Sequence, residues 1–129
     1  MSTLLYYLGV SLLLTHEMDA VAHAEWRLLF VLRDMSDQAA YPVFIALHVP
    51  LVFLFFWLGH SSKHTVRRVF RAVVAAFLVI HALIHFSLSN APEYTFHGVL
   101  SNSLIYGAAL CGIAYLALSF FRPSAGNTD

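Results

Sequence analysis

Four long apolar stretches, separated by short polar segments, make up most of this 129-residue chain. They cover about residues 4 to 32, 43 to 59, 70 to 89 and 99 to 121, and a membrane-crossing helix needs about 20 residues. A soluble domain of this size cannot bury a composition that is 60% hydrophobic and only 11% charged. We therefore predict an all-α fold, an integral membrane four-helix bundle. It forms a single transmembrane domain over residues 1–122, and residues 123–129 form a disordered tail.

Basic residues indicate which side of the membrane each loop faces. Lys63, Arg67, Arg68 and Arg71 lie between the second and third stretches with no acid among them, and Arg122 follows the fourth. By the positive-inside rule both segments face the cytoplasm. The N- and C-termini are then both cytoplasmic, and we expect the protein in the cell membrane, in bacteria the inner membrane.

Charge and cysteine content exclude several function classes. The formal net charge is zero and no basic stripe is present, so we expect no nucleic-acid partner. The single Cys111 excludes a disulfide framework and a cysteine zinc site. The expected partners are the lipid bilayer and a hydrophobic small-molecule substrate, and the oligomeric state stays open.

A polar segment, Thr15–Arg27, interrupts the first apolar stretch with the sequence THEMDAVAHAEWR. A charge at mid-bilayer costs about 2.5 to 3.5 kcal/mol on insertion scales, whereas each leucine stabilises insertion by only about 0.5 kcal/mol. Glu17 and Asp19 should therefore face the bundle interior and be paired. Ala22-His23-Ala24 resembles a signal-peptide cleavage site, but the N-terminal Met-Ser-Thr has no positive charge and the polar region is too long. We therefore expect the segment to remain as the outer half of the first helix.

Histidines from three predicted helices fall at similar depth. Aromatic belts and a rise of about 1.5 Å per residue place six of the eight histidines between the midplane and the outer face. They are His16, His23, His48, His81, His85 and His97. On a helical wheel His16, Asp19 and His23 span about 60°, and the i, i+4 spacing of His81 and His85 puts both imidazoles on one helix face.

This clustering predicts a metal site of imidazole and carboxylate ligands. The predicted ligands are His16, Asp19, His23, His48, His81 and His85. Such ligands suit transition metals, of which we expect zinc or iron first. If the site is hydrolytic, Asp19 or Glu17 would be the catalytic base. Arg27 and His97 would support the ligands, whereas the wheel points Glu25 nearly opposite to them.

Two other interpretations of the same residues stay open. In one, the polar groups satisfy one another and hold the helices in register. In the other, His48 and either His81 or His85 are the axial ligands of haem b. Both favour a module without enzymatic activity: a haem carrier, a proton or metal conduit, or an accessory subunit. Whether the protein is an enzyme is not decided by the sequence.

The motifs also carry a resemblance. HEMDA followed by EWRLL, then HVPL, HALIH and YTFHGVLSNSLIYG, resemble a family of small bacterial integral membrane proteins of unknown function. That family is marked by a His-Glu-x-Asp-Ala run followed by Glu-Trp-Arg. The resemblance implies that residues 16–27 contain its shared pattern, including Glu17 and Glu25, which would then support the ligands by orienting the imidazoles. It implies no activity.

Overall fold

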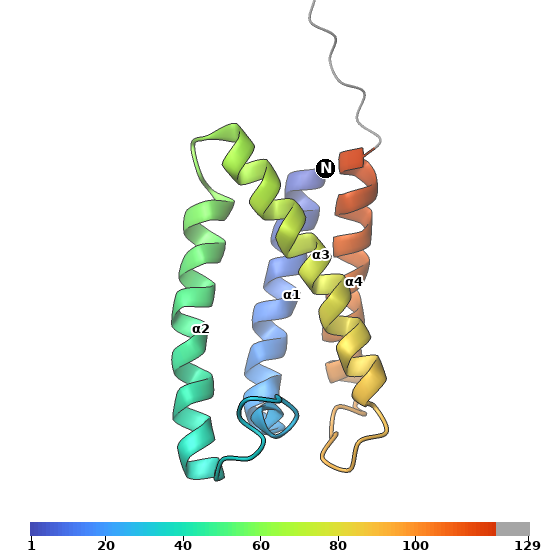
Figure 1. Cartoon of the computed structure of the whole chain (residues 1–129). Coiled ribbons are helices and arrows are strands. Elements are labelled where there is room, and N and C mark those ends of the chain that lie inside the picture. Colours follow the sequence, from blue (N-terminus) through green and yellow to red (C-terminus); the bar gives the residue numbers. More distant parts are fainter. Residues whose placement is uncertain (121–129) are drawn as a thin grey trace, which may run out of the picture.

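The computed structural model describes residues 1–120 and is all-α (Figure 1). Its four long helices are α1 (Ser2–Ala22), α2 (Asp37–Gly59), α3 (His64–Leu88) and α4 (Val99–Phe120). A short 3-10 helix, η1 (Glu25–Arg27), lies between α1 and α2. The predicted tail, 123–129, lies outside the described residues. Met1 and Phe120 lie at one end of the molecule, and the loops after α1 and α3 lie at the other.

Helices α1, α3 and α4 form the closely packed part of the protein. Small residues allow this packing, since a Cβ added at Gly112 of α4 would lie 2.5 Å from the carbonyl oxygen of Ala75 in α3. Gly9 of α1 is similarly close to Leu78 and Cys111. Small residues that let helix backbones approach closely are typical of helix packing in membranes. The apolar core therefore lies among these three helices.

Helix α2 stands away from this core and contacts it mainly near its two ends (Figure 1). Near its start, the ring of Phe44 lies 5.8 Å from that of Trp26, centroid to centroid. Near its end, the Tyr6 hydroxyl donates a hydrogen bond to the carbonyl of Phe55. No residue between Phe44 and Phe55 is buried. The middle of α2 therefore leaves room for a cavity beside α1 and α3.

The boundaries of three helices differ from those predicted. The first helix, expected over residues 4 to 32, ends at Ala22 because Ala24 adopts the left-handed conformation, with φ 53° and ψ 47°. The second begins at Asp37 rather than near 43, with Pro42 inside it, where a proline removes only one hydrogen bond close to the helix start. The third begins at His64 rather than near 70.

Among the helices of residues 1–120, three are long and apolar enough to cross a membrane, namely α2, α3 and α4. Helix α1 does not belong to this set and carries Glu17 and Asp19. It differs from the other three because its polar segment lies within the helix rather than in a loop. The surroundings of its charged side chains therefore decide how α1 fits into the bundle.

Candidate metal centre

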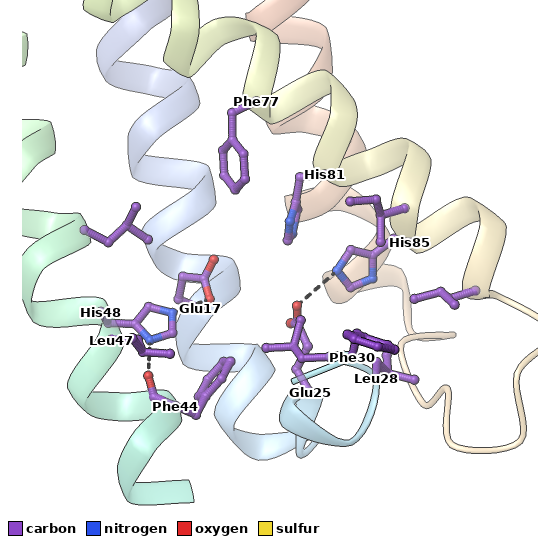
Figure 2. Close-up of a pocket in the computed structure, with 14 residues that line it drawn as sticks. Glu17, Glu25, Leu28, Phe30, Phe44, Leu47, His48, Phe77, His81 and His85 are labelled. Atoms are coloured by element: carbon purple, nitrogen blue, oxygen red, sulfur yellow. Dashed lines mark hydrogen bonds and ion pairs between the residues drawn. The ribbon is translucent and has the colours of Figure 1, made fainter. Parts of the chain in front are cut away.

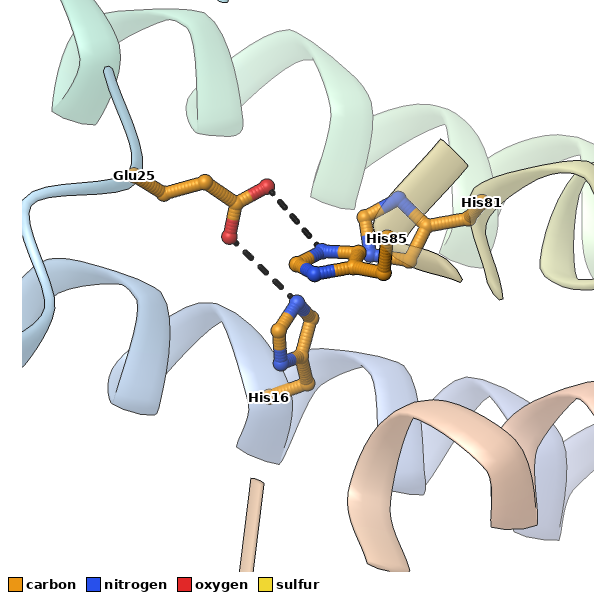
Figure 3. Close-up of side chains that lie close together, drawn as sticks. All are labelled: His16, Glu25, His81 and His85. Atoms are coloured by element: carbon orange, nitrogen blue, oxygen red, sulfur yellow. Dashed lines mark ion pairs between the residues drawn. The ribbon is translucent and has the colours of Figure 1, made fainter. Parts of the chain in front are cut away.

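Four side chains from three elements meet near the loop end of the bundle (Figure 3). His16 comes from α1, Glu25 from η1, and His81 and His85 from successive turns of α3. We call these four residues the His3Glu group. One ligand atom from each lies within 4.8 Å of every other. The imidazole centroids are 5.0 Å apart for His16 and His81 and 4.9 Å apart for His16 and His85.

Glu25 reaches this group because the helix ends before it. The left-handed Ala24 turns the backbone, and the side chain of Glu25 then points back between α1 and α3. Its Oε2 lies 3.3 Å from His16 Nε2, and its Oε1 lies 3.6 Å from His85 Nε2. The helical wheel placed Glu25 on the opposite face because it assumed that α1 continues through this residue. That orientation was wrong, and no glycine marks the turn in the sequence.

The group is buried and its hydrogen bonding is incomplete. His16 is fully buried, and Glu25 and His85 are nearly so. Within residues 1–120, four of the buried polar atoms here lack a hydrogen-bond partner: both ring nitrogens of His16, Nε2 of His81 and Oε2 of Glu25. His16 Nε2 and Glu25 Oε2 face each other as an ion pair, whereas Nδ1 of His16 and Nε2 of His81 have neither a hydrogen bond nor an ion pair within residues 1–120. Leaving such an atom unsatisfied costs about 1 to 3 kcal/mol, so a partner for it is favoured.

The electrostatics of the group favour an ionised carboxylate. Burial alone would raise the pKa of Glu25, but the neighbouring imidazoles of His16 and His85 outweigh burial and lower this pKa to about 2. The lowered pKa keeps the carboxylate of Glu25 ionised, which is the form of this side chain that binds a metal ion.

Aromatic residues of the α3–α4 loop cover the group. Phe96 is fully buried, and its ring lies 5.0 Å from that of His85 and 5.6 Å from that of His16. The Tyr94 hydroxyl lies 3.4 Å from His85 Nδ1, and burial raises the pKa of Tyr94 to about 12. His97 is exposed outside this layer and packs on Tyr94. The loop therefore separates the group from the solvent side.

A second polar pair joins α1 to α2 across a cavity (Figure 2). Glu17 Oε2 lies 2.8 Å from His48 Nε2, and His48 Nδ1 lies 2.7 Å from the carbonyl oxygen of Phe44. The cavity has a volume of about 460 Å³, and it is lined by this pair, by Glu25, His81 and His85, and otherwise by apolar side chains. His48 is therefore on the far side of the cavity, with both ring nitrogens hydrogen-bonded.

The remaining predicted residues lie outside the His3Glu group. Asp19 and His23 face each other, with Oδ1 and Nδ1 3.3 Å apart. Arg27 forms an exposed ion pair with Asp37, which also accepts a hydrogen bond from Trp26 Nε1. Of the six predicted ligands, the structure thus brings together His16, His81 and His85 and adds Glu25. It places Asp19, His23 and His48 in pairs elsewhere.

Comparison with known proteins gives a family without an assigned role. The model of a family described as "Family of unknown function (DUF6713)" matches residues 2–122. No curated protein and no solved structure matches the chain. The match agrees with the expectation of a family of unknown function, and it covers all of the residues described above.

Proposed function

The chain belongs to this family of unknown function, and we propose that it is an integral membrane protein that binds one transition-metal ion at the His3Glu group. One observation carries the proposal: four ligand atoms from three separate elements, all within 4.8 Å of one another, converge in the protein interior. The ligands come from positions far apart in the sequence, so ordinary helix periodicity does not explain their convergence. A metal ion bound by all four side chains would explain it.

The distances between the ligand atoms support a bound metal because these atoms need to move only a little closer together. Metal bonds to imidazole and carboxylate are about 2.0 to 2.2 Å, so neighbouring ligand atoms of a tetrahedral site lie about 3.3 Å apart. The contacts from Glu25 to His16 and to His85 are already 3.3 and 3.6 Å. Small rotations of His81 would complete the set. Three imidazoles and one carboxylate suit zinc or iron.

The two alternative interpretations fit the geometry less well. A polar network without metal should satisfy its own buried groups, yet Nδ1 of His16 and Nε2 of His81 have no hydrogen-bond or ion-pair partner within residues 1–120. A bis-histidine haem would use His48, whose two ring nitrogens already bond Glu17 and a backbone carbonyl. A metal ion instead uses the nitrogens that have no partner.

A membrane location is part of the proposal, and the surface of the helices supports it. Large apolar side chains are exposed along α2, α3 and α4, among them Phe53, Trp57, Leu83 and Leu110. Water would be a poor solvent for these faces, whereas lipid chains cover them at no comparable cost. The two ends of the described chain on one side agree with an even number of crossings.

The cavity brings a candidate general base close to the proposed metal site. Glu17 lines it together with His81 and His85, so Glu17 is our candidate for the general base of a reaction on a lipid-like substrate. Asp19 is not among the residues that line the cavity, and its nearest partner is His23. Of the two acids predicted as catalytic, the geometry therefore favours Glu17.

Elemental analysis of protein purified without a histidine tag tests the metal. We expect close to one zinc or iron per chain in the wild type, and loss of that metal in His16→Ala and His81→Ala. His64→Ala removes an exposed histidine at the start of α3 and should keep the metal. His23→Ala should also keep it, which separates the His3Glu group from the larger set predicted from sequence.

Circular dichroism and size-exclusion profiles in detergent must show that each variant remains folded. Wild-type protein without metal would disprove the proposal. Equal loss of metal in His64→Ala would show that the ion is bound outside the His3Glu group.

A further inference from the structure

The exposed residues that line the cavity beside α2 belong to α2, to α3 and to the loop segment Leu28–Phe30 that follows η1. Several residues that line it are also exposed on the outside of the protein, including Leu47 at 56%, Phe77 at 36% and Ile84 at 47%. These three residues lie in the middle of α2 and in α3, where the two helices are separate. In a membrane, this opening faces the lipid chains.

Side chains pack between α2 and the other elements at both ends of the cavity, and the exposed lining residue at the loop end, Phe30, is itself apolar. At the loop end, Trp26 packs on Phe44 of α2, and the buried Phe96 covers the His3Glu group. At the other end, Tyr6 bonds the Phe55 carbonyl, and Phe55 packs near Phe70 with ring centroids 6.4 Å apart. A molecule that reaches the cavity should therefore come from the side, out of the bilayer.

The polar part of the cavity wall includes an acceptor that the protein leaves available. His48 Nδ1 must donate its hydrogen to the Phe44 carbonyl, because a carbonyl can only accept. The 2.8 Å hydrogen bond between His48 Nε2 and Glu17 Oε2 uses only one of the two carboxyl oxygens of Glu17. Figure 2 shows the second oxygen of Glu17 turned away from His48, toward the side of Phe77 and His81.

We propose that this cavity binds a neutral single-chain amphiphile with a hydroxyl-bearing head, which enters from the bilayer between α2 and α3. Its chain would lie along Leu47, Phe77 and Ile84, and its hydroxyl would donate a hydrogen bond to Glu17. The inference rests on the membrane location in the proposed function, but it does not require the metal.

Charge and size both select this class of ligand. The polar lining of the cavity includes the carboxyl groups of Glu17 and Glu25, to which a neutral hydroxyl can donate a hydrogen bond. An anionic head would approach the carboxylates of Glu17 and Glu25. The volume of about 460 Å³ lies in the lower half of the range for small-molecule pockets, which fits one chain better than a two-chain lipid.

Photolabelling in phosphatidylcholine nanodiscs tests the proposal. The probe is a monoacylglycerol with a diazirine in its acyl chain, and mass spectrometry maps the labelled residues. We expect labels to concentrate on the cavity faces of α2 and α3. Leu47→Trp fills the opening and should reduce labelling at least fivefold. Leu110→Trp, at an exposed position on α4, adds the same bulk elsewhere and should leave labelling unchanged.

Competition experiments test the head group. Unlabelled monoacylglycerol should compete about tenfold better than the methyl ester of the same fatty acid, which has no hydroxyl, as expected for one hydrogen bond to a charged group. Glu17→Leu should remove this difference. Because the two competitors are compared on wild-type protein, the test does not depend on the folding of that variant.

The outcomes separate this inference from the metal proposal. Labels spread evenly over the lipid-facing surface, or equal labelling of Leu47→Trp and wild type, would overturn the cavity proposal even if metal is bound. Equal competition by the ester would overturn the head-group assignment. Localised labelling of a protein that contains no metal would support the cavity and reject only the metal centre.

Discussion

The left-handed backbone conformation of Ala24 leads to a prediction that links the stability of the protein to the His3Glu group. Ala24 has φ 53° and ψ 47°, and it is the only residue of the described chain other than glycine with a positive φ. We expect Ala24→Gly to stabilise the protein and to keep the position of Glu25. We expect Ala24→Val to destabilise it and to weaken metal binding, because a β-branched residue tolerates this conformation poorly.

The magnitude follows from two opposing effects. A left-handed conformation costs an alanine about 1 to 2 kcal/mol, and glycine does not incur this cost. The greater freedom of glycine in the unfolded chain offsets about 0.4 to 1 kcal/mol of that gain. The net gain for Ala24→Gly is therefore about 0 to 1.6 kcal/mol, and its central value of about 0.8 kcal/mol raises the unfolding temperature by about 2 to 5 °C in a domain of this size.

Thermal unfolding in detergent, followed by tryptophan fluorescence, measures this effect. Ala46→Gly is the matched control, since Ala46 is exposed in the middle of α2 and glycine there should lower stability by about 0.5 to 1 kcal/mol. The two substitutions are chemically the same but should change the stability of the protein in opposite directions. If Ala24→Gly unfolds below the wild type, as Ala46→Gly should, the turn is not left-handed and our account of Glu25 fails.

Three further predictions concern packing, a buried cation and the cover of the site. Gly112→Ala should cost about 1 to 3 kcal/mol in the free energy of unfolding, because its Cβ would meet an α3 carbonyl oxygen at 2.5 Å. Gly107→Ala, with a nearest contact of 3.4 Å, should instead raise the free energy of unfolding by about 0.5 to 1 kcal/mol in the same assay, because alanine favours the helix over glycine. Arg71→Leu should cost about 2 to 4 kcal/mol in denaturant titrations, because the buried guanidinium donates to a backbone carbonyl and to two hydroxyls. Tyr94→Phe should weaken metal binding about tenfold in competition with a chromophoric chelator, because it removes the hydroxyl beside Nδ1 of His85. Unchanged affinity in that variant would show that the hydroxyl does not orient this ligand.

The parts of the site that the sequence predicted are those that depend on helix periodicity alone. The i, i+4 spacing placed His81 and His85 on one face of α3, and counting depth along two helices placed His16 beside them. Both inferences need only the rise and twist of a regular helix. The four helices themselves follow from the apolar stretches, with boundaries that differ by several residues.

The parts that the sequence missed depend on breaks in that periodicity. Ala24 is a strong helix former, and a glycine at that position would have signalled the turn, but an alanine does not. The wheel therefore directed Glu25 away from the site that it joins. The separation of α2 from α1 was equally hidden, because an apolar helix that faces lipid and one that faces protein have the same composition. His48 was consequently assigned to the metal although it faces Glu17.

The acids of the polar segment Thr15–Arg27 are paired in a way that fits the proposed membrane location. Each of them has a histidine as its partner: Glu17 pairs with His48, Asp19 with His23, and Glu25 with His16 and His85. A lysine or arginine partner would carry its own charge into the bilayer, at a cost similar to that of the acid. An imidazole can be neutral or protonated, so it can partner an acid without bringing a permanent charge of its own. Two of these histidines, His16 and His85, would also provide nitrogen atoms for the proposed metal ion.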